Sequence, residues 1–489
     1  MSDNGTNESV TLTIDGEDVT VPKGTTILQA IGEAGTEIPH YCYHPGLSSP
    51  AMCRLCLVEV EGAPKLLPSC VTQATEGQVV HTESENAAGM RRGVLEFYLV
   101  NHPLDCPICD MSGECKLQDY VFSEGRERGR SREPKRIFGR DDFGGDILFY
   151  GDRCVMCTRC VRFMDEIEQK PLLSVVDRGD RSVIDTFFDR GLEEAEWGGN
   201  VVDLCPVGAL VSKDFLHKAR PWDLKHTPSV CGSCSQGCNI DLHTRDNLVQ
   251  RIKPRFNADV NGHWICDFGR ANYEWLNRGG RVEEPTFVED GGPVQLGWDA
   301  ALEALERRFG GVSGGVKAVV SASWSNEDLD AVAKLVESLG GGEIVFRSAR
   351  AEDESPLHGF PSLARRRDLV PNIKGAELLG MTRVGDDEGR GGLEGVADHD
   401  GLIVVLGDDL ADQDESFGAQ ASLYVYLGAH TSAGASRAHF TLPVCTFAER
   451  EGTFTNHEGT VQQFSPALEA PASARPASEV ILPLVGAPA

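Results

Sequence analysis

The sequence predicts a multidomain protein in which small α+β domains precede a C-terminal α/β domain. Three features of the 489-residue chain lead to this prediction. All of its 16 cysteines except Cys445 lie within the first 266 residues, where they form four separate groups. A hairpin pattern and a helix precede the first of these groups. Beyond residue 296, apolar runs of strand length alternate with a helical stretch, which is typical of an α/β layered domain.

The composition limits the classes of function. The chain has 75 Asp and Glu residues against 46 Lys and Arg, with a formal net charge of −29. This balance argues against a nucleic-acid-binding surface, which needs positive charge. No apolar run approaches the ~18 residues of a membrane-spanning helix, and the start lacks the basic region and apolar core of a signal peptide. We therefore expect a cytoplasmic location, where grouped cysteines indicate metal binding rather than disulfides.

Residues 8–86 are expected to form a β-grasp domain. Residues 10–14 and 19–21 alternate apolar and polar side chains around an Asp-Gly pair, which is a strong signal for a hairpin turn. Residues 25–34 have the pattern of a short helix, and a cysteine-containing loop follows. The first cysteine set lies in this domain and consists of Cys42, Cys53, Cys56 and Cys70.

The spacing of the first set favours a [2Fe–2S] cluster. Only two residues separate Cys53 from Cys56, so that both thiolates can bind one iron. A plant-type ferredoxin has a similar run with a shorter first gap. Zinc is the alternative metal, and His40 and His44 could then serve as ligands.

The second set lies in residues 87–125, after a stretch with helical spacing (87–100) that ends just before a histidine. The set consists of His102, Cys106, Cys109 and Cys115. We expect it to bind a [4Fe–4S] cluster. A neutral imidazole in place of one thiolate makes the cluster less negative, which should raise its potential and make its electrons depend on local protonation. The alternative is a cluster held by the three cysteines, with water as the fourth ligand.

Residues 145–222 carry the remains of a two-cluster ferredoxin pattern. Such a domain has the run Cys-x2-Cys-x2-Cys-x3-Cys-Pro twice, and the fourth cysteine of each run binds the other cluster. Met164 replaces the fourth cysteine of the first run, and Ala195, Gly198 and Val201 replace the first three of the second run. One complete set therefore remains for a [4Fe–4S] cluster. This third set consists of Cys154, Cys157, Cys160 and Cys205.

The fourth set lies in residues 224–282. It consists of Cys231, Cys234, Cys238 and Cys266. A short paired motif followed by a distant cysteine suits a [4Fe–4S] cluster. The same pattern also suits a zinc ribbon, which is the alternative for this set.

The last domain, residues 283–489, is expected to be an α/β layer. Its strand-like runs lie at 317–321, 343–346, 402–406 and 423–427, and its helical stretch lies at 326–339. Residues 123–146 and 279–295 are rich in charge and glycine and are expected to be connectors. The chain has no Gly-x-Gly-x-x-Gly run and no Gly-Lys phosphate loop, so neither NADH nor FMN has a visible binding motif. Cys445 stands alone and is expected to be a buried apolar residue.

Two segments resemble a known family closely. They are His-Pro-Leu-Asp-Cys-Pro-Ile-Cys-Asp-Met-Ser-Gly-Glu-Cys-Lys-Leu-Gln-Asp at 102–119 and Asp-Arg-Cys-Val-Met-Cys-Thr-Arg-Cys-Val-Arg-Phe at 152–163. Together with the order of the four sets, they make residues 10–280 similar to the large iron–sulfur subunit of respiratory complex I. In bacteria this is the G subunit of NADH-quinone oxidoreductase, and in mitochondria it is the 75-kDa subunit. The fourth set is found only in some bacterial members.

Beyond residue 225 the chain resembles a molybdopterin oxidoreductase domain, most clearly at 451–462. The stretch is much shorter than the catalytic core of that family. After Cys266, Phe268 stands where pterin enzymes usually have the lysine of a Cys-x-Lys-Gly motif. The resemblance therefore implies a truncated domain, and we expect it to bind no molybdopterin.

The resemblance implies an electron-relay subunit in the peripheral arm of proton-translocating NADH:quinone oxidoreductase. NADH is oxidised at FMN in a partner flavoprotein subunit, and electrons enter this chain at the first set. They pass to the third set, then to the second, and leave for a ferredoxin-like [4Fe–4S] subunit that leads to quinone. The fourth set lies off this path and has a structural role.

The same resemblance implies one [2Fe–2S] cluster, three [4Fe–4S] clusters and no catalytic residue in this chain. It also implies a peripheral location on the cytoplasmic side of the plasma membrane. Other peripheral-arm subunits are then partners, nucleic acid is not, and the membrane is reached only through the complex.

Two other functions fit parts of the sequence. The electron-input (diaphorase) subunit of an NAD-linked hydrogenase or a formate dehydrogenase shares the first three sets. A di-iron hydrogenase needs a further cysteine group, and a formate dehydrogenase needs the full pterin core; the chain has neither. A zinc-stapled assembly scaffold is the non-redox alternative, which metal analysis separates because zinc has no redox chemistry.

Overall fold

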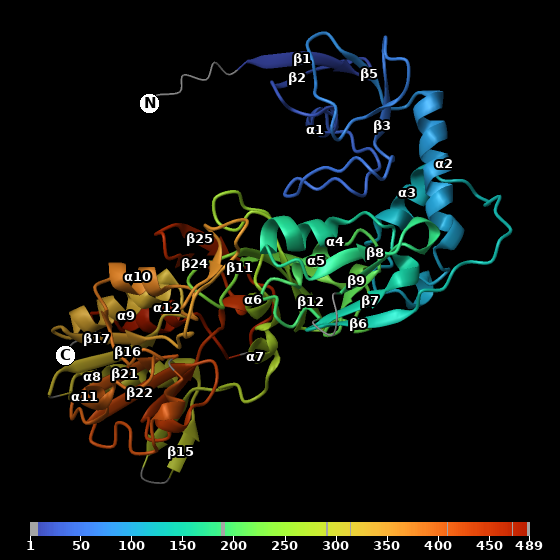
Figure 1. Ribbon diagram of the computed structural model, residues 1–489. Coiled ribbons are helices and arrows are strands. Elements are labelled where there is room, and N and C mark those ends of the chain that lie inside the picture. The colour runs from blue at the N-terminus through green and yellow to red at the C-terminus, as the bar shows by residue number, and fades with distance from the viewer. Residues whose placement is uncertain are drawn as a thin grey trace. The chain divides into compact units, whose positions relative to one another are not determined.

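The computed structural model describes residues 8–186, 191–289, 292–312, 314–407, 409–471 and 473–486. The chain folds as two compact units, one ending at Asp223 and the other beginning at Leu224 (Figure 1). The first unit contains the first three cysteine sets, and the second unit contains the fourth. The predicted combination of small mixed domains with a C-terminal α/β domain is confirmed.

The first unit begins with a small mixed sheet that packs on one helix. Its elements are β1 (Ser9–Ile14), β2 (Glu17–Pro22), α1 (Ile27–Glu33), β3 (Leu57–Val60), β4 (Leu67–Pro68) and β5 (Val79–His81). The strands have the order β2-β1-β5-β3-β4. β1 and β2 form the expected hairpin, where Asp15 and Gly16 have φ angles of 48° and 93°, as a two-residue turn requires. Ile31 of α1 packs with Leu12 and Val80 in the core of this domain.

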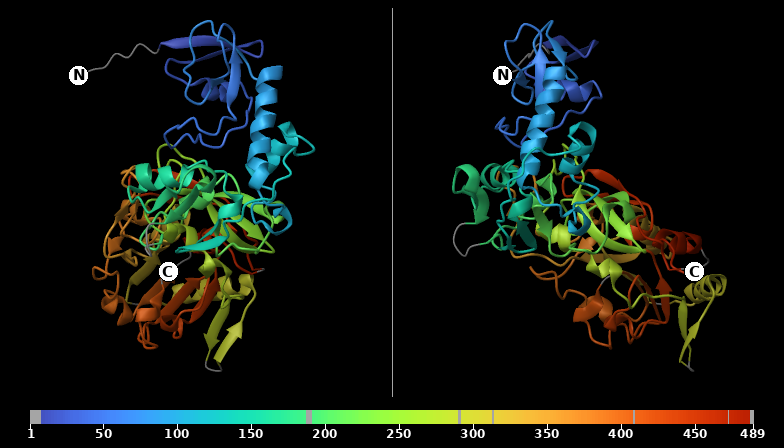
Figure 2. Two further views of the ribbon diagram at one scale, coloured as in Figure 1. Left: turned by 45° about the vertical axis from the view of Figure 1, so that its right-hand side comes forward. Right: turned by 90° about the vertical axis from the view of Figure 1, so that its right-hand side faces the viewer.

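A long helix then leads to the second cysteine set (Figure 2). This segment contains α2 (Glu85–Asn101), η1 (Cys106–Ile108) and α3 (Lys116–Glu124). α2 is capped at its start by Ser84, whose hydroxyl accepts a hydrogen bond from the helix, and ends just before His102, as its apolar spacing predicts. Arg91 on α2 is fully buried and pairs with Glu124 on α3, which ties the two helices together.

The rest of the first unit is built from short elements around the third set. They are β6 (Arg140–Gly144), β7 (Ile147–Tyr150), η2 (Gly151–Arg153), α4 (Arg159–Arg162), η3 (Phe163–Glu168), β8 (Leu173–Val176), η4 (Gly179–Arg181), β9 (Val183–Thr186), α5 (Asn200–Leu204), β10 (Leu210–Ser212) and η5 (Pro221–Asp223). The prediction of a connector at 123–146 is wrong at its end. β6 joins a sheet of order β10-β7-β6, and its Phe143 stacks on Phe149 with ring centroids 4.7 Å apart.

The second unit begins with an antiparallel meander that carries the fourth set. Its elements are β11 (Lys225–Val230), β12 (Asn239–Arg245), β13 (Leu248–Pro254), α6 (Asp267–Ala271) and α7 (Glu274–Asn277). β12 pairs with both of the other strands. Ile240 and Leu242 of β12 are buried, so the sheet has an apolar side that packs within the unit.

An eight-stranded sheet forms the body of the second unit. The remaining elements are β14 (Thr286–Glu289), β15 (Gly292–Gln295), α8 (Trp298–Phe309), β16 (Val316–Ser321), α9 (Asn326–Ser338), β17 (Gly342–Arg347), β18 (Ser355–Pro356), β19 (Ala364–Arg365), α10 (Ile373–Leu378), β20 (Thr382–Arg383), α11 (Glu394–Ala397), β21 (Leu402–Leu406), η6 (Leu410–Asp412), β22 (Leu423–Gly428), η7 (Ala433–Ala435), β23 (Phe440–Pro443), η8 (Phe447–Glu449), β24 (Gly452–Thr455), β25 (Val461–Phe464), α12 (Ala477–Ile481) and η9 (Leu482–Leu484). The sheet order is β15-β14-β23-β22-β21-β16-β17-β20, and its six strands from β23 to β20 are parallel.

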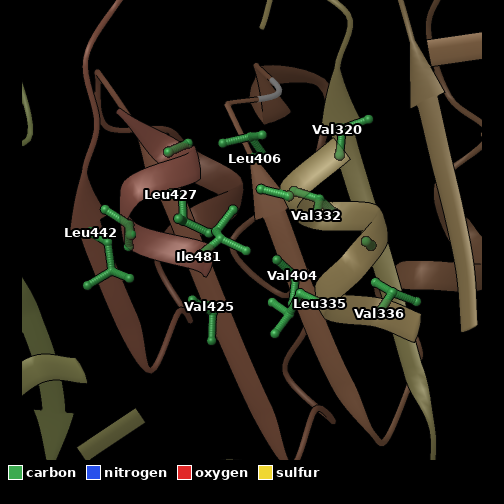
Figure 3. Packing of buried hydrophobic residues seen from close by; sticks show 14 of the residues in the cluster. Val320, Val332, Leu335, Val336, Val404, Leu406, Val425, Leu427, Leu442 and Ile481 are labelled. Atoms are coloured by element: carbon green, nitrogen blue, oxygen red, sulfur yellow. The ribbon is translucent and has the colours of Figure 1, made fainter. Parts of the chain in front are cut away.

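The core of this sheet follows from its apolar strands. Figure 3 shows Val332 and Leu335 of α9 and Ile481 of α12 against Val404 and Val425 of the central strands. A strand buried on both faces reads as a continuous apolar run, which is why β21 and β22 are visible in the sequence. The expected connector at 279–295 is wrong in part, because β14 pairs with β23 and so belongs to the sheet.

No helix within the described parts of the chain is both long enough and apolar enough to cross a membrane.

Candidate metal centres

The four cysteines of the first set lie in the segment between α1 and β3 and in the turn after β4. All four side chains are buried. Cys42 is in hydrogen-bond contact with Cys53 and with Cys70, and Cys70 also contacts Cys56. The Tyr41 N–H donates to the Cys53 sulfur at 3.4 Å. The fold therefore gathers the four thiols that the sequence groups.

The two histidines named as alternative ligands of the first set are engaged with the local backbone. Nδ1 of His40 lies 2.9 Å from the Ile38 carbonyl oxygen, and the Gly46 N–H donates to Nδ1 of His44 at 3.1 Å. Burial lowers the pKa of His40. These contacts hold both rings against the backbone. The side-chain contacts within the first set are between its cysteines.

The second set is built around the ends of two helices. His102 is the cap at the end of α2, and Cys115 is the cap from which α3 begins. His102, Cys106 and Cys115 line one cavity of about 650 Å³. Cys109 packs on Gly208, where an added Cβ would be only 2.2 Å from the cysteine sulfur. Burial, with added contributions from Cys109 and Cys106, raises the pKa of Cys115 to about 11.

The histidine of this set has the protonation state that a metal ligand needs. Burial is the main cause that lowers the pKa of His102 to about 4, and the cations of Lys135 and Arg153 lower it further. The ring is therefore neutral at physiological pH. A neutral imidazole has a free nitrogen lone pair, which is the form that binds metals.

The third set is formed by one tight loop and one distant cysteine. Met156 and Thr158 have φ angles of 50° and 58°, which is uncommon for residues other than glycine and turns the loop so that its cysteines converge. The Met156 N–H donates to the Cys154 sulfur at 3.3 Å. Cys205 follows α5 and completes the set. Burial raises the pKa of Cys160 well above its usual value, and the other three thiols of the set add to this effect.

The positions of the lost second cluster are filled with core residues. Met164 is fully buried, Ala195 and Val201 are 5% and 0% exposed, and Gly198 is also buried. Apolar packing therefore occupies the volume where a second set of ligands would stand.

The fourth set lies in the second unit, between the first two strands of the meander and α6. Cys231 follows β11, Cys238 precedes β12, and Cys266 is the cap of α6. The Gly269 N–H donates to the Cys266 sulfur at 3.3 Å, and a Cβ at Gly269 would lie 3.1 Å from the Cys231 sulfur. Burial raises the pKa of Cys238 well above its usual value, and the three other thiols of the set contribute.

The donor chemistry of the four sets fits iron–sulfur clusters. In every set at least one backbone N–H group points at a cysteine sulfur. Such hydrogen bonds, with burial, are what tune the potential of a cluster. Buried thiols ionise only where a cation compensates the charge, and iron supplies that cation.

Within the described residues, no three His, Cys, Asp or Glu side chains stand close enough together to hold a metal ion as they are placed. In an iron–sulfur cluster each iron takes only one or two protein ligands, and inorganic sulfide completes its coordination.

The third set adjoins both other sets of the first unit. Burial, and then the thiols of Cys53 in the first set and Cys157 in the third, raise the pKa of Tyr98, which therefore lies beside both. On the other side, Gly208 stands three residues after Cys205 and abuts a sulfur of the second set. Tyr41 is near Cys53 of the first set and Cys115 of the second, so these two sets also approach each other.

Sequence reasoning missed two arginines beside the third set. Arg153 and Arg162 are 4% and 9% exposed. Arg153 binds Asp105, which directly precedes a cysteine of the second set, and Arg162 binds the carbonyl oxygen of Cys42 in the first set. The available signal was two cations directly beside a thiolate motif in an acidic protein. Their partners lie far away in the sequence and could not be read from it.

Five family models match the chain in order. They are a 2Fe-2S iron-sulfur cluster binding domain at residues 7–85, the NADH-ubiquinone oxidoreductase-G iron-sulfur binding region at 91–130, the NADH-quinone oxidoreductase subunit 3 ferredoxin-like domain at 144–211, a molybdopterin oxidoreductase Fe4S4 domain at 224–278 and molybdopterin oxidoreductase at 372–486. The chain therefore contains both 2Fe–2S and 4Fe–4S binding domains.

Several curated proteins are similar to a large part of the chain. The G subunit of NADH-quinone oxidoreductase from Rickettsia bellii is 41% identical over 297 residues, which is 60% of this chain and 43% of the relative. The NADH-ubiquinone oxidoreductase 75 kDa subunit of Reclinomonas americana is 40% identical over 342 residues, 70% of this chain and 49% of the relative. The iron-sulfur protein 1 of mitochondrial NADH dehydrogenase from Solanum tuberosum is 44% identical over 290 residues, which is 59% of this chain and 39% of the relative.

The matched stretch therefore spans less than half the length of each of these relatives. Among solved structures, a chain of an NAD+-reducing [NiFe]-hydrogenase is 31% identical with a TM-score of 0.40, and the match covers 43% of this chain and 91% of that chain.

Proposed function

We propose that this chain, a homologue of the bacterial G subunit of NADH-quinone oxidoreductase and of the mitochondrial 75-kDa subunit, relays electrons in the peripheral arm of NADH:quinone oxidoreductase. The observation that carries the proposal is the placement of three ligand sets in one compact unit, where the third set adjoins the other two. Electron transfer between metal centres needs such proximity and a shell that excludes water.

The proposed cofactors are one [2Fe–2S] cluster in the first set and one [4Fe–4S] cluster in each of the others. Their ligands are Cys42, Cys53, Cys56 and Cys70; His102, Cys106, Cys109 and Cys115; Cys154, Cys157, Cys160 and Cys205; and Cys231, Cys234, Cys238 and Cys266. When bound, these clusters supply one-electron redox chemistry that protein side chains alone do not offer. The proposed domains are 8–86, 87–125, 145–222, 224–282 and 283–489.

The residues of this chain hold and tune the clusters, and none acts as a general acid, base or nucleophile. Cysteine thiolates bind iron, backbone N–H groups stabilise the negative sulfurs, and the neutral ring of His102 lowers the negative charge of the second set. Most of the cysteines are buried, which keeps water away from their sulfurs, whereas Cys106 is exposed and Cys154 and Cys205 are half-buried.

The proposed route enters at the first set, continues to the third and leaves from the second. The donor would be the FMN- and NADH-binding flavoprotein subunit, and the acceptor a ferredoxin-like [4Fe–4S] subunit on the way to quinone. The names of the relatives, which are NADH:quinone and NADH:ubiquinone oxidoreductase subunits, support these ends of the route. The fourth set lies in the other unit and would stand off the path. The chain would sit peripherally on the cytoplasmic side of the membrane.

Metal analysis of the anaerobically purified protein tests this proposal. The expected content is about 14 iron and about 14 acid-labile sulfide per chain. Low-temperature EPR after dithionite reduction should show both [2Fe–2S] and [4Fe–4S] signals. About 10 iron with about one zinc would assign zinc to the fourth set and leave the relay intact. Zinc without iron, and without any signal, would overturn the electron-relay function.

A further inference from the structure

Two buried arginines flank the third set, one on each side. Arg153 directly precedes its first cysteine, and Arg162 ends α4, which carries its third. Each guanidinium reaches from the third set to the segment of a neighbouring set. We propose that Arg162 and Arg153 are positioning residues for two separate electron-transfer steps: Arg162 for the step between the first and third sets, and Arg153 for the step between the third and second sets. This inference rests on the electron-relay function proposed above.

Arg162 joins the backbone of a ligand in one set to that of a ligand in another. Its Nη2 donates to the Cys42 carbonyl oxygen at 2.5 Å and to the Cys157 carbonyl oxygen at 3.3 Å. Its Nη1 donates to the Ser48 carbonyl oxygen. One rigid, planar group therefore fixes the separation of two ligand segments that are more than a hundred residues apart in sequence.

Neighbouring side chains strengthen the same junction. Arg159 donates to the Tyr43 carbonyl oxygen and, at 3.3 Å, to the Leu204 carbonyl oxygen, which directly precedes the last cysteine of the third set. Glu166 accepts hydrogen bonds from the N–H and the hydroxyl of Ser48, the former at 2.9 Å. The junction between the first and third sets is therefore held by several groups, among which Arg162 contacts a ligand of each set.

Arg153 makes the corresponding junction to the second set. Its Nε and Nη2 both donate to Oδ2 of Asp105 at 3.0 Å, and Asp105 directly precedes Cys106. Its Nη1 donates to the Gly208 carbonyl oxygen at 3.4 Å, and Gly208 abuts the Cys109 sulfur. The guanidinium lies over the Tyr150 ring, 4.0 Å from the centroid, which fixes its plane.

These contacts carry both geometry and charge. With clusters bound, each step would move one electron from reduced iron in one set to oxidised iron in the next, with no bond formed or broken and no proton transferred. The rate of such a step depends on the separation of the two centres and on how little the surroundings must rearrange. An arginine stays charged, and its fixed donors provide a preorganised environment for two centres of negative charge.

The test uses Arg162→Lys and Arg153→Lys in the assembled complex, and each variant is the matched control for the other. Lysine keeps the charge but cannot reproduce the planar fork of donors. Iron content, dipolar coupling between neighbouring reduced clusters by pulsed EPR, and freeze-quench kinetics are measured together. Arg162→Lys should weaken the coupling of the first and third sets and slow their exchange roughly tenfold, since outer-shell partners typically matter by that order. The coupling of the third and second sets should stay unchanged, and Arg153→Lys should give the opposite pattern.

Other outcomes would overturn the inference. Unchanged couplings in both variants with full iron would show that the arginines position nothing, and equal changes of both couplings in either variant would show a general structural role. Loss of cluster iron in both lysine variants would mean that the arginines retain the clusters rather than space them. Absence of iron in the wild-type protein would instead refute the electron-relay function, which keeps the two failures distinct.

Discussion

Gly208 lies three residues after Cys205 of the third set and packs closely on Cys109 of the second set. A Cβ at this position would stand 2.2 Å from the Cys109 sulfur, far inside contact distance. If Cys109 binds iron as proposed, its sulfur could not move away without leaving that iron. The requirement for glycine here arises from a contact made across the fold, and the Cys205-Pro206 motif by itself does not reveal it.

We predict that Gly208→Ala removes the cluster of the second set. About four iron per chain should be lost, together with the corresponding EPR signal. Gly89→Ala is the control, because nothing lies within 4 Å of a Cβ built there on α2. Full iron content and an unaltered second-set signal in Gly208→Ala would contradict the packing described.

Glu168 is a buried carboxyl group whose ionisation opposes folding. Burial raises its pKa to about 7 from the usual 4.5, although Lys170 Nζ lies 3.5 Å from one of its oxygens. The unfolded chain releases this proton near pH 4.5 and the folded chain only near pH 7. Between these values the unfolded state binds fewer protons, so this group lowers stability as the pH rises.

We therefore predict that Glu168→Gln stabilises the protein at pH 8 and has little effect at pH 4. The expected gain is about 3 kcal/mol in the free energy of unfolding at the higher pH. Thermal unfolding monitored by circular dichroism at both pH values measures it. Glu127→Gln, at an exposed position, is the control with the same change of charge. An equal effect of Glu168→Gln at both pH values would show that the carboxyl group is not desolvated.

At the scale of elements, a buried ion pair joins helices of the second unit. Arg450, which follows η8, pairs with Asp328 on α9, and their side chains are 4% and 0% exposed. The Ser478 N–H on α12 donates to the same carboxylate at 2.9 Å. Loss of one partner would leave an unpaired charge in the core, which is costlier than loss of both.

Arg450→Leu should therefore destabilise the second unit by about 3 kcal/mol. The double variant Arg450→Leu, Asp328→Asn should recover part of this loss, because the uncompensated charge is gone. Denaturant unfolding of the three proteins checks the order, and unchanged EPR signals of the first three sets confirm that the first unit is intact. A double variant less stable than the single one would refute the argument.

Elements with a strong local pattern could be predicted from the sequence. The Asp-Gly hairpin, the helix that ends just before His102 and the buried strands β21 and β22 lie where their patterns place them. β14 and β15 could not be predicted, because their acidic, glycine-containing sequence is typical of a linker. They pair with each other, and β14 also pairs with the distant β23. β6 also escaped prediction because its sequence is charged and contains glycine, although its partner β7 is the next strand along the chain.

The candidate sites divide in the same way. Cysteine spacing groups the predicted ligands because it encodes local geometry, and in the fold the cysteines of each set are neighbours. That these sets bind clusters stays a prediction. Which sets adjoin one another depends on contacts between distant segments, such as those of Arg162 with Cys42. Cysteine spacing therefore indicates which residues are candidate metal ligands. Which sets are neighbours depends on how the unit folds.

At the scale of the whole molecule, the division into two units separates three sets from the fourth. The first and second sets also approach each other at Tyr41, so the first unit offers a direct path as well as the path through the third set. The proposed function requires that electrons take the path through the third set. Removal of the third set would stop electron flow on the path through it, but would not stop flow on the direct path from the first set to the second.

The most direct test is freeze-quench EPR of the assembled complex after mixing with NADH, using wild type and Cys157→Ala. This variant removes a proposed ligand of the third set, and Cys238→Ala, which removes a proposed ligand of the fourth, is the control. We predict that the first set of Cys157→Ala is reduced as in wild type, while its second set stays oxidised on the timescale of turnover. In Cys238→Ala both sets should be reduced normally. Reduction of the second set at the wild-type rate in Cys157→Ala would contradict a relay through the third set.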